Sequence, residues 1–139
     1  PSSRFVADFI GSMNFFPGEV TKSGNGRVRI STDSMGEIDI PASNSEYVAR
    51  SPVWVAIRPE KLKPVFSAPQ DLSNVMQGIM GPSAYLGDRS HFYVHISKRE
   101  EPVLVALQNL ERSIDMLSGP NQKVWLKWST ESLVILPRD

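Results

Sequence analysis

One stretch of this chain occurs twice, and this repeat limits the possible folds more than any other feature. The segment 53–62, VWVAIRPEKL, returns as the segment 124–133, VWLKWSTESL. The identical residues are Val53, Trp54, Glu60 and Leu62, each repeated 71 positions later (53 + 71 = 124, 62 + 71 = 133). Each copy begins with the apolar, aromatic and β-branched run that is typical of a strand. The sequence therefore predicts a small β unit that is used twice.

Turn residues divide the rest of the chain into short apolar segments, a pattern that is typical of an all-β protein. Ser23-Gly24-Asn25-Gly26 predicts a tight hairpin, because Gly and Asn tolerate positive φ. Val28 and Ile30 alternate with Arg27 and Arg29, which indicates a half-buried strand whose arginines face water. The predicted strands are 15–21, 26–31, 36–40, 52–57, 75–80, 91–97, 103–107, 123–128 and 133–136.

The predicted organisation is a short helix followed by two lobes. Phe5, Val6, Phe9 and Ile10 recur at helical spacing between Ser3 and Gly11, so residues 1–11 should include a short apolar helix that needs a partner surface. The polar connection near residues 66–72 predicts a first lobe over 12–66 and a second over 67–139, packed together as one unit. Residues 44–50 could add one further helical turn.

Composition disfavours several classes of function. The 15 basic residues balance 15 acidic ones, so no long-range field attracts nucleic acid or anionic lipid. Cysteine is absent, which excludes disulfides and thiolate zinc sites and favours a reducing compartment. The apolar runs are far shorter than the roughly 20 residues that cross a bilayer.

The residues that could carry chemistry are better explained by packing. His91 and His95 lie on a predicted strand, where four residues span roughly 13 Å, too far to share one metal ion. No Gly precedes a Lys, so the sequence lacks a phosphate-binding Gly-x-x-x-x-Gly-Lys-Ser/Thr loop. Trp54 and Trp125 could form a base-stacking platform, but their equivalent places in the repeat favour core packing. We therefore expect no catalytic, cofactor-binding or metal-binding residues in this chain.

Arg58 and Glu60 flank Pro59 where the first copy of the repeat ends. Because Pro59 fixes its own φ and holds Arg58 extended, the strand should stop at Ile57 or Arg58 and turn. The two charged side chains are candidates for an ion pair or a partner contact, and the simpler alternative is a turn with solvated charges.

Several motifs in succession give the chain a family resemblance. FVADFIG at 5–11, Arg58-Pro59-Glu60, Ala84-Tyr85-Leu86-Gly87-Asp88 and the stretch 128–136 resemble the C-terminal, transport-associated OB-like (TOBE) part of ATP-binding subunits of bacterial ABC importers. Within that family, segments 53–62, 84–88 and 106–109 resemble the polyamine branch, the putrescine importer ATPase above all. Spermidine, iron, maltose and aminophosphonate importers carry similar tails.

The resemblance implies an all-β fold of two OB-like lobes and a non-enzymatic, regulatory or dimerisation role. Residues 1–11 would then end a nucleotide-binding domain that lies upstream, and ATP and magnesium would bind there, with no cofactor in this fragment. The implied partners are a second copy of the subunit and, through the parent, the permease, at the cytoplasmic face of the membrane. Gly87 and Asp88 would form a family turn motif with a possible interaction role.

Two rival functions follow from the same residues. Paired barrels of this type also occur as free-standing intracellular modules that bind a small ligand or an oxyanion, and a reading frame that begins near Pro1 would favour that alternative. A single-strand nucleic-acid binder would show salt-sensitive binding to oligonucleotides, and the neutral charge counts against it.

Overall fold

The computed structural model describes residues 13–41, 47–86, 89–108 and 121–138, of which the side chains of 83–86 are left aside. The helix expected within residues 1–11 lies outside this part of the chain. Of the turn expected at 44–50, only 47–50 are described, and Ala49 and Arg50 form a turn there. No helix among the described residues has the length and apolarity that a membrane crossing requires.

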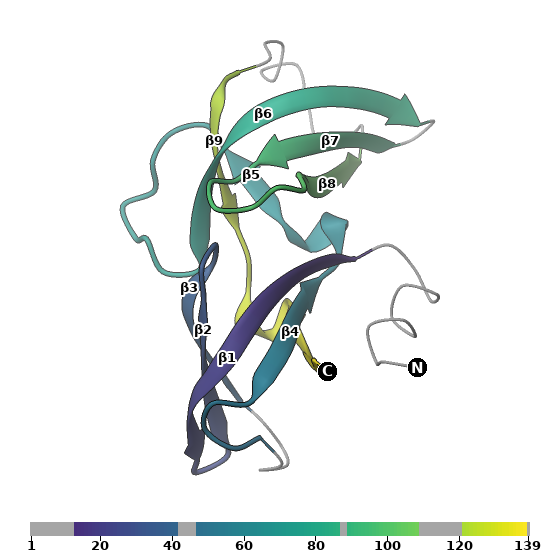
Figure 1. Cartoon of the computed structure of the whole chain (residues 1–139). Coiled ribbons are helices and arrows are strands. Elements are labelled where there is room, and N and C mark those ends of the chain that lie inside the picture. The colour runs from purple at the N-terminus through teal and green to yellow at the C-terminus, as the bar shows by residue number, and fades with distance from the viewer. Residues whose placement is uncertain (1–12, 42–46, 87–88, 109–120, 139) are drawn as a thin grey trace. The chain divides into compact units, whose positions relative to one another are not determined.

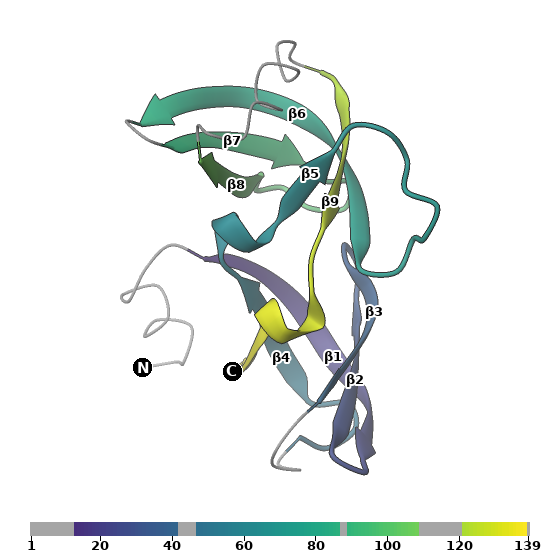
Figure 2. The ribbon, with the colours of Figure 1, turned by 180° about the vertical axis from the view of Figure 1, so that it is seen from behind.

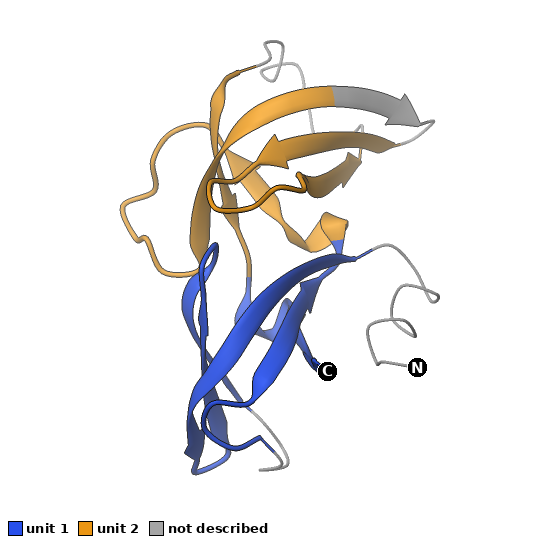
Figure 3. Cartoon of the chain, in the orientation of Figure 1, with its two compact units in different colours: residues 1–58, 129–139 blue, residues 59–128 orange. Residues whose placement is uncertain are grey.

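The chain folds into two compact units, and unit 1 consists of the residues up to Arg58 together with those from Ser129 onward (Figure 3). Its five strands form an antiparallel sheet in the order β10-β4-β1-β2-β3, of which Figure 1 labels β1 to β4. The strands are β1 (Asn14–Gly24), β2 (Arg27–Thr32), β3 (Gly36–Pro41), β4 (Pro52–Ile57) and β10 (Val134–Pro137). A 3-10 turn, η3 (Thr130–Ser132), packs against the edge strand β3.

Unit 2 spans Pro59–Trp128 and repeats the arrangement of unit 1. Its antiparallel sheet has the order β5-β9-β6-β7-β8, and the 3-10 turn η1 (Pro59–Lys61) packs against the edge strand β8. The strands are β5 (Lys63–Val65), β6 (Val75–Leu86), β7 (Arg89–His95), β8 (Val103–Gln108) and β9 (Lys123–Lys127). The all-β fold class and its two lobes are therefore confirmed.

The lobe boundaries differ from the predicted division at residues 66 and 67. The chain leaves unit 1 after Arg58 and returns to it at Ser129. In Figure 2, the yellow C-terminal segment continues from β9 toward the end marked C. The physical reason is strand exchange. Strand β4 pairs with β10, and β5 pairs with β9, so each copy of the repeat begins in one unit and ends in the other.

The exchange follows the sequence repeat residue by residue. In unit 2, Lys63 of β5 is opposite Lys127 of β9. The repeat relates Lys63 to Val134 (63 + 71 = 134) and Lys127 to Ala56 (127 − 71 = 56). In unit 1, Val134 of β10 is indeed opposite Ala56 of β4. Strand β5 itself escaped prediction, because three residues that include a proline carry no strand signal.

The core of each unit is formed by the inward face of its strands. In β2, Val28 and Ile30 are buried while Arg27 and Arg29 are exposed, as their alternation predicted. The fully or nearly fully buried side chains include Phe16, Val20, Val28, Ile30, Ile38, Val53, Val55, Ala56 and Ile57 in unit 1, and Leu62, Met76, Met80, Phe92, Val94, Val103, Val105, Val124 and Leu126 in unit 2.

Strands β1 and β6 share two backbone features that allow them to curve. Gly18 is opposite Val53, and Gly78 is opposite Val124, so the two glycines occupy equivalent places. A β-bulge follows two residues later in each strand, after Val20 in β1 and after Met80 in β6. Bulges increase strand twist and bend, and the long curved β6 in Figure 1 shows the result.

A local turn orders the connection between β5 and β6. The hydroxyl and the backbone N–H of Ser73 both donate to one carboxylate oxygen of Asp71, the latter at 3.0 Å. These hydrogen bonds stabilise the charged form and lower the pKa of Asp71, with the hydroxyl contributing most.

Candidate functional site

The predicted turn at Arg58 and Glu60 is present. Strand β4 ends at Ile57, Pro59 is buried, and the side chains of Arg58 and Glu60 are both exposed. No ion pair joins either side chain to a residue in the described part of the chain. The geometry therefore favours solvated charges at a turn, and a partner contact there stays a prediction. Gly87 and Asp88, the other predicted interaction residues, lie outside the described residues.

The repeated tryptophans do not belong to the core face. In β4, Val53, Val55 and Ile57 are buried, whereas Trp54 points to the opposite face and is half-buried. Trp125 of β9 has the same placement relative to Val124 and Leu126. The core-packing interpretation of this pair was wrong in that respect, because strand alternation sends each Trp away from its buried neighbours.

On that outer face, Trp54 is held by two neighbours. The Phe15 ring meets the Trp54 ring edge to face, with centroids 6.1 Å apart. The guanidinium of Arg138 lies 5.6 Å from the centroid of the Trp54 ring, within the range of a cation–π contact. Arg138 also donates from Nε to the carbonyl of Val53 (3.0 Å) and from Nη2 to the carbonyl of Gly18 (2.8 Å). These contacts fasten the segment that follows β10 to strands β1 and β4.

The histidine pair lies on a strand, as the sequence indicated. Both residues belong to β7, with His91 half-buried and His95 exposed. Among the described residues, no three His, Asp or Glu side chains come together as a metal site would require.

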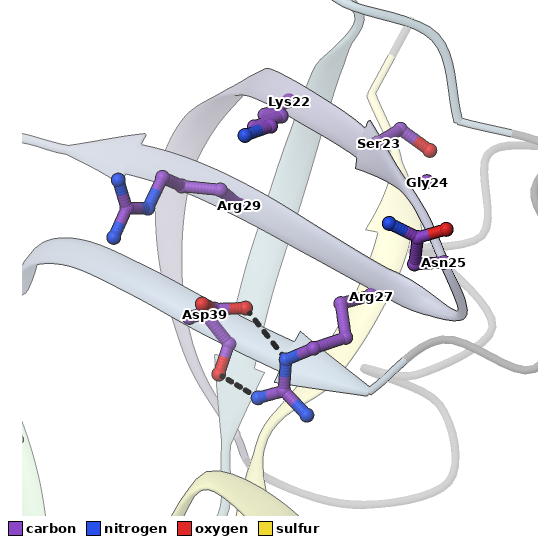
Figure 4. A pocket seen from close by; sticks show the side chains of 7 residues that line it. All are labelled: Lys22, Ser23, Gly24, Asn25, Arg27, Arg29 and Asp39. Atoms are coloured by element: carbon purple, nitrogen blue, oxygen red, sulfur yellow. Dashed lines mark hydrogen bonds and ion pairs between the residues drawn. The ribbon is translucent and has the colours of Figure 1, made fainter.

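A surface hollow of about 350 Å³ lies on the outer side of the β1–β2 hairpin and adjoins β3. The hairpin turn has Asn25 at φ 57° and Gly26 at φ 72°, as the Gly-Asn-Gly signal predicted. Seven residues line the hollow (Figure 4), namely Lys22, Ser23, Gly24, Asn25, Arg27, Arg29 and Asp39. Three cations and one carboxylate give the lining a net charge of two positive units.

The carboxylate of Asp39 is committed to one of the three cations. Arg27 donates from Nε to Oδ1 of Asp39 at 3.0 Å and from Nη2 to its carbonyl oxygen at 3.3 Å. No ion pair is formed by Lys22 or Arg29 with any described residue, and Figure 4 shows both side chains without a marked interaction. The hollow therefore holds two cations that form no ion pair with a carboxylate in the described part of the chain.

Sequence reasoning missed this hollow because of the β-bulge. In a regular strand, Val20 and Lys22 would share a face, and Lys22 would point into the core. The bulge places Lys22 opposite Arg29 instead, so its side chain is exposed beside the arginines of β2. The arginines were predicted to face water, but no sequence signal gives the position of the bulge or the choice of Asp39 for Arg27.

Comparison of the whole fold with solved structures identifies its class. The chain superposes on a crystal structure of the cytoplasmic molybdate-binding protein ModG with a TM-score of 0.74, over 90% of this chain and 96% of that one, at 11% identity. Such identity shows the fold alone. The two equivalent five-stranded units define a tandem OB-like module.

Sequence comparison gives the family. The TOBE domain matches residues 55–136, more than half of the chain, and the chain belongs to that family. It is 34% identical to the putrescine transport ATP-binding protein PotG of Escherichia coli (strain K12), over 98% of this chain and 36% of that protein. It is 30% identical to the spermidine/putrescine import ATP-binding protein PotA of Trichodesmium erythraeum (strain IMS101), over 91% of this chain and 34% of that protein. The chain thus spans about a third of the length of these curated relatives.

Proposed function

We propose that this chain is the C-terminal accessory domain of an ABC importer ATPase for polyamines, with putrescine as the leading substrate. The observation that carries the proposal is the similarity to a putrescine transport ATP-binding protein along 98% of the chain. The relatives extend well beyond the matched segment, which leaves room for a nucleotide-binding domain in the parent. ATP and magnesium would bind in that domain, since these 139 residues contain no Gly-Lys phosphate loop.

The accessory role consists of pairing with a second copy of the subunit at the cytoplasmic face of the membrane, below the permease. The sheets end in the edge strands β10 and β3 in unit 1 and β5 and β8 in unit 2. The turns η3 and η1 pack against β3 and β8. The strand β10 keeps Val134 43% exposed, so an isologous contact along such an edge would bury apolar surface in both copies.

The substrate proposal is tested in the gene that encodes this chain. We expect a Gly-x-x-x-x-Gly-Lys-Ser/Thr loop upstream of Pro1 and a loss of radiolabelled putrescine uptake when the codons for residues 13–139 are removed. Uptake of maltose in the same cells is the control and should not change. A reading frame that begins near Pro1 would instead favour the free-standing ligand-binding module.

The pairing proposal has a separate test, light scattering on the purified chain across a range of concentrations. A rise in mass toward a dimer is expected. A strict monomer at the highest concentration would contradict pairing through this domain and leave the transport assignment standing.

A further inference from the structure

Two cations face each other directly across the β1–β2 hairpin. Lys22 and Arg29 are cross-strand partners, so their Cβ atoms lie roughly 5 Å apart. Like charges in this position are destabilising. Asp39 is the partner of Arg29 on its other side, but its carboxylate bonds to Arg27. An anion seated between Lys22 and Arg29 would remove this repulsion.

The hollow offers further donors around the same point. Ser23 and Asn25 line it beside the cations, and a hydroxyl and an amide both donate to oxyanions. Asp39 holds Arg27 in place through hydrogen bonds to its Nε and Nη2, and within the described residues no other bond of this guanidinium is seen. A guanidinium presents its donors in a planar fork that suits phosphate oxygens.

The positive charge is confined to the hairpin end of this face. The next row toward the other end consists of Glu19, Ser31 and Glu37, which are paired in register and exposed. A long acidic chain laid over the face would meet these two carboxylates. A compact anion at the hairpin end would avoid them, and the volume of about 350 Å³ suits such a ligand.

We propose that the hollow formed by Lys22, Arg27 and Arg29 is a binding site for a compact, doubly charged oxyanion of the phosphate class. Two negative charges would neutralise the lining. The phosphate comes either free from solution or as the exposed group of a larger molecule, and the chemistry of recognition is the same. This inference does not depend on the transported solute or on the parent protein.

Titration of the labelled chain with inorganic phosphate, followed by NMR at constant ionic strength with chloride as the balancing ion, tests the site. We expect saturable shifts of the backbone amides of residues 22–29 with a Kd of about 1 mM or tighter. The double variant K22Q/R29Q should raise that Kd at least roughly tenfold, because it removes two charge-assisted hydrogen bonds. Shifts that grow linearly with phosphate would overturn the proposal.

The matched control is K63Q/K123Q, which makes the same charge change on exposed lysines of β5 and β9. This control variant should bind phosphate with the Kd of the unaltered chain. An equal loss of affinity in both variants would show non-specific attraction and contradict the proposed site. Thermal unfolding is the second readout. Phosphate should raise the Tm of the unaltered chain and of K63Q/K123Q, but not that of K22Q/R29Q. Without phosphate, the Tm of K22Q/R29Q should be no lower than that of the unaltered chain, because the repulsion between Lys22 and Arg29 is gone.

Two further arms distinguish the sources of the phosphate group. Glucose 6-phosphate tests a soluble monoester, and phosphatidylcholine vesicles with and without phosphatidic acid test a lipid headgroup. Binding to either that is lost in K22Q/R29Q and kept in K63Q/K123Q identifies the source. These two arms only name the source, because absence of saturable binding to inorganic phosphate already rejects the proposal.

Discussion

Unit 1 and unit 2 have equivalent backbone hydrogen bonds at positions where their side chains differ. In unit 1, the N–H of Val20 donates to the carbonyl of Ser51 (2.9 Å), and the N–H of Arg50 donates to the carbonyl of Val20 (2.6 Å). In unit 2, Met80 makes the same two bonds with Gln122 (2.8 Å) and Asn121 (3.0 Å). The duplication has therefore kept the points where the backbone bends, while the residues at those points have changed.

The left-handed residues follow the same plan. Arg50 has φ 72° and Asn121, 71 positions later, has φ 69°. Asn adopts this conformation at modest cost, whereas Arg rarely does. The conformation is thus kept with a less favourable residue, and in both units this residue donates its N–H to the bulged strand.

The units differ in how their exchanged strands are fastened. After β10, Arg138 reaches back to Val53, Gly18 and Trp54. The equivalent residue after β5 is Ser67 (138 − 71 = 67), which is exposed. Unit 1 thus secures its exchanged strand with a side-chain clamp, and the equivalent position of unit 2 has a serine that cannot make these contacts.

The largest expected effect comes from the repeated leucine that follows each 3-10 turn. Leu62 is fully buried in unit 2 and Leu133 is 8% exposed in unit 1. Replacing either with Ala should lower the free energy of unfolding by about 2–5 kcal/mol, and Leu62→Ala should cost more because its site is better enclosed. Urea denaturation measures both values, with Val134→Ala at a 43% exposed position as the control. A larger loss at Leu133 would break the ranking.

The equivalent glycines should respond unequally to alanine. A Cβ on Gly18 would lie 2.7 Å from Cγ2 of Ile30, and its other neighbours are at 3.2 Å or beyond. A Cβ on Gly78 would lie 2.5 Å from Cγ1 of Val94 and 2.9 Å from the carbonyl oxygen of His95, which belongs to the backbone and yields less.

Gly78→Ala should therefore destabilise by about 1–3 kcal/mol and Gly18→Ala by less. Thermal unfolding of the two variants gives the order. Gly26→Ala, at an open turn position with φ 72°, separates the cost of strain from the cost of crowding. Equal values for Gly18 and Gly78 would mean that the neighbouring backbone moves as easily as a side chain.

The repeat also predicts where proline is tolerated in the edge strand β10. Pro64 of β5 is equivalent to Ile135 of β10 (64 + 71 = 135), so the N–H of Ile135 should face away from β4. The carbonyl of Ile135 also faces away from β4, since it accepts a hydrogen bond from the Tyr47 hydroxyl at 3.3 Å.

Leu136→Pro removes a hydrogen bond between β10 and β4 and leaves a carbonyl of β4 unpaired. Its loss of unfolding free energy should therefore exceed that of Ile135→Pro by about 1–3 kcal/mol. The two substituted side chains are both half-buried, so loss of packing is matched. Urea denaturation compares them, and equal destabilisation would refute the equivalence of β5 and β10.

The sequence was sufficient for the fold class and for most strands, because their signals are local. Alternation located β2, the Gly-Asn-Gly turn located the first hairpin, and Pro59 marked the end of β4. The repeat revealed the duplication. The exchange of β5 and β10 could not be predicted, since contiguous segments pair with neighbours by default, and β5 has three residues and a proline. The hollow at Lys22 depends on a bulge, for which the sequence has no marker.

The smallest expected effect on stability comes from Arg138, whose contacts distinguish unit 1 from unit 2. Arg138→Ala removes two hydrogen bonds to carbonyls and a cation–π contact, and should cost roughly 1–2 kcal/mol because the side chain is only half-buried. Arg138→Lys should recover less than half of that loss, since an ammonium lacks the planar fork that reaches both Val53 and Gly18. Ser67→Ala, at the equivalent exposed position of unit 2, is the control and should leave the Tm unchanged. If Arg138→Ala also leaves the Tm unchanged, the sheet pairing of β10 with β4 is enough to hold the exchanged strand, and the two units are fastened alike.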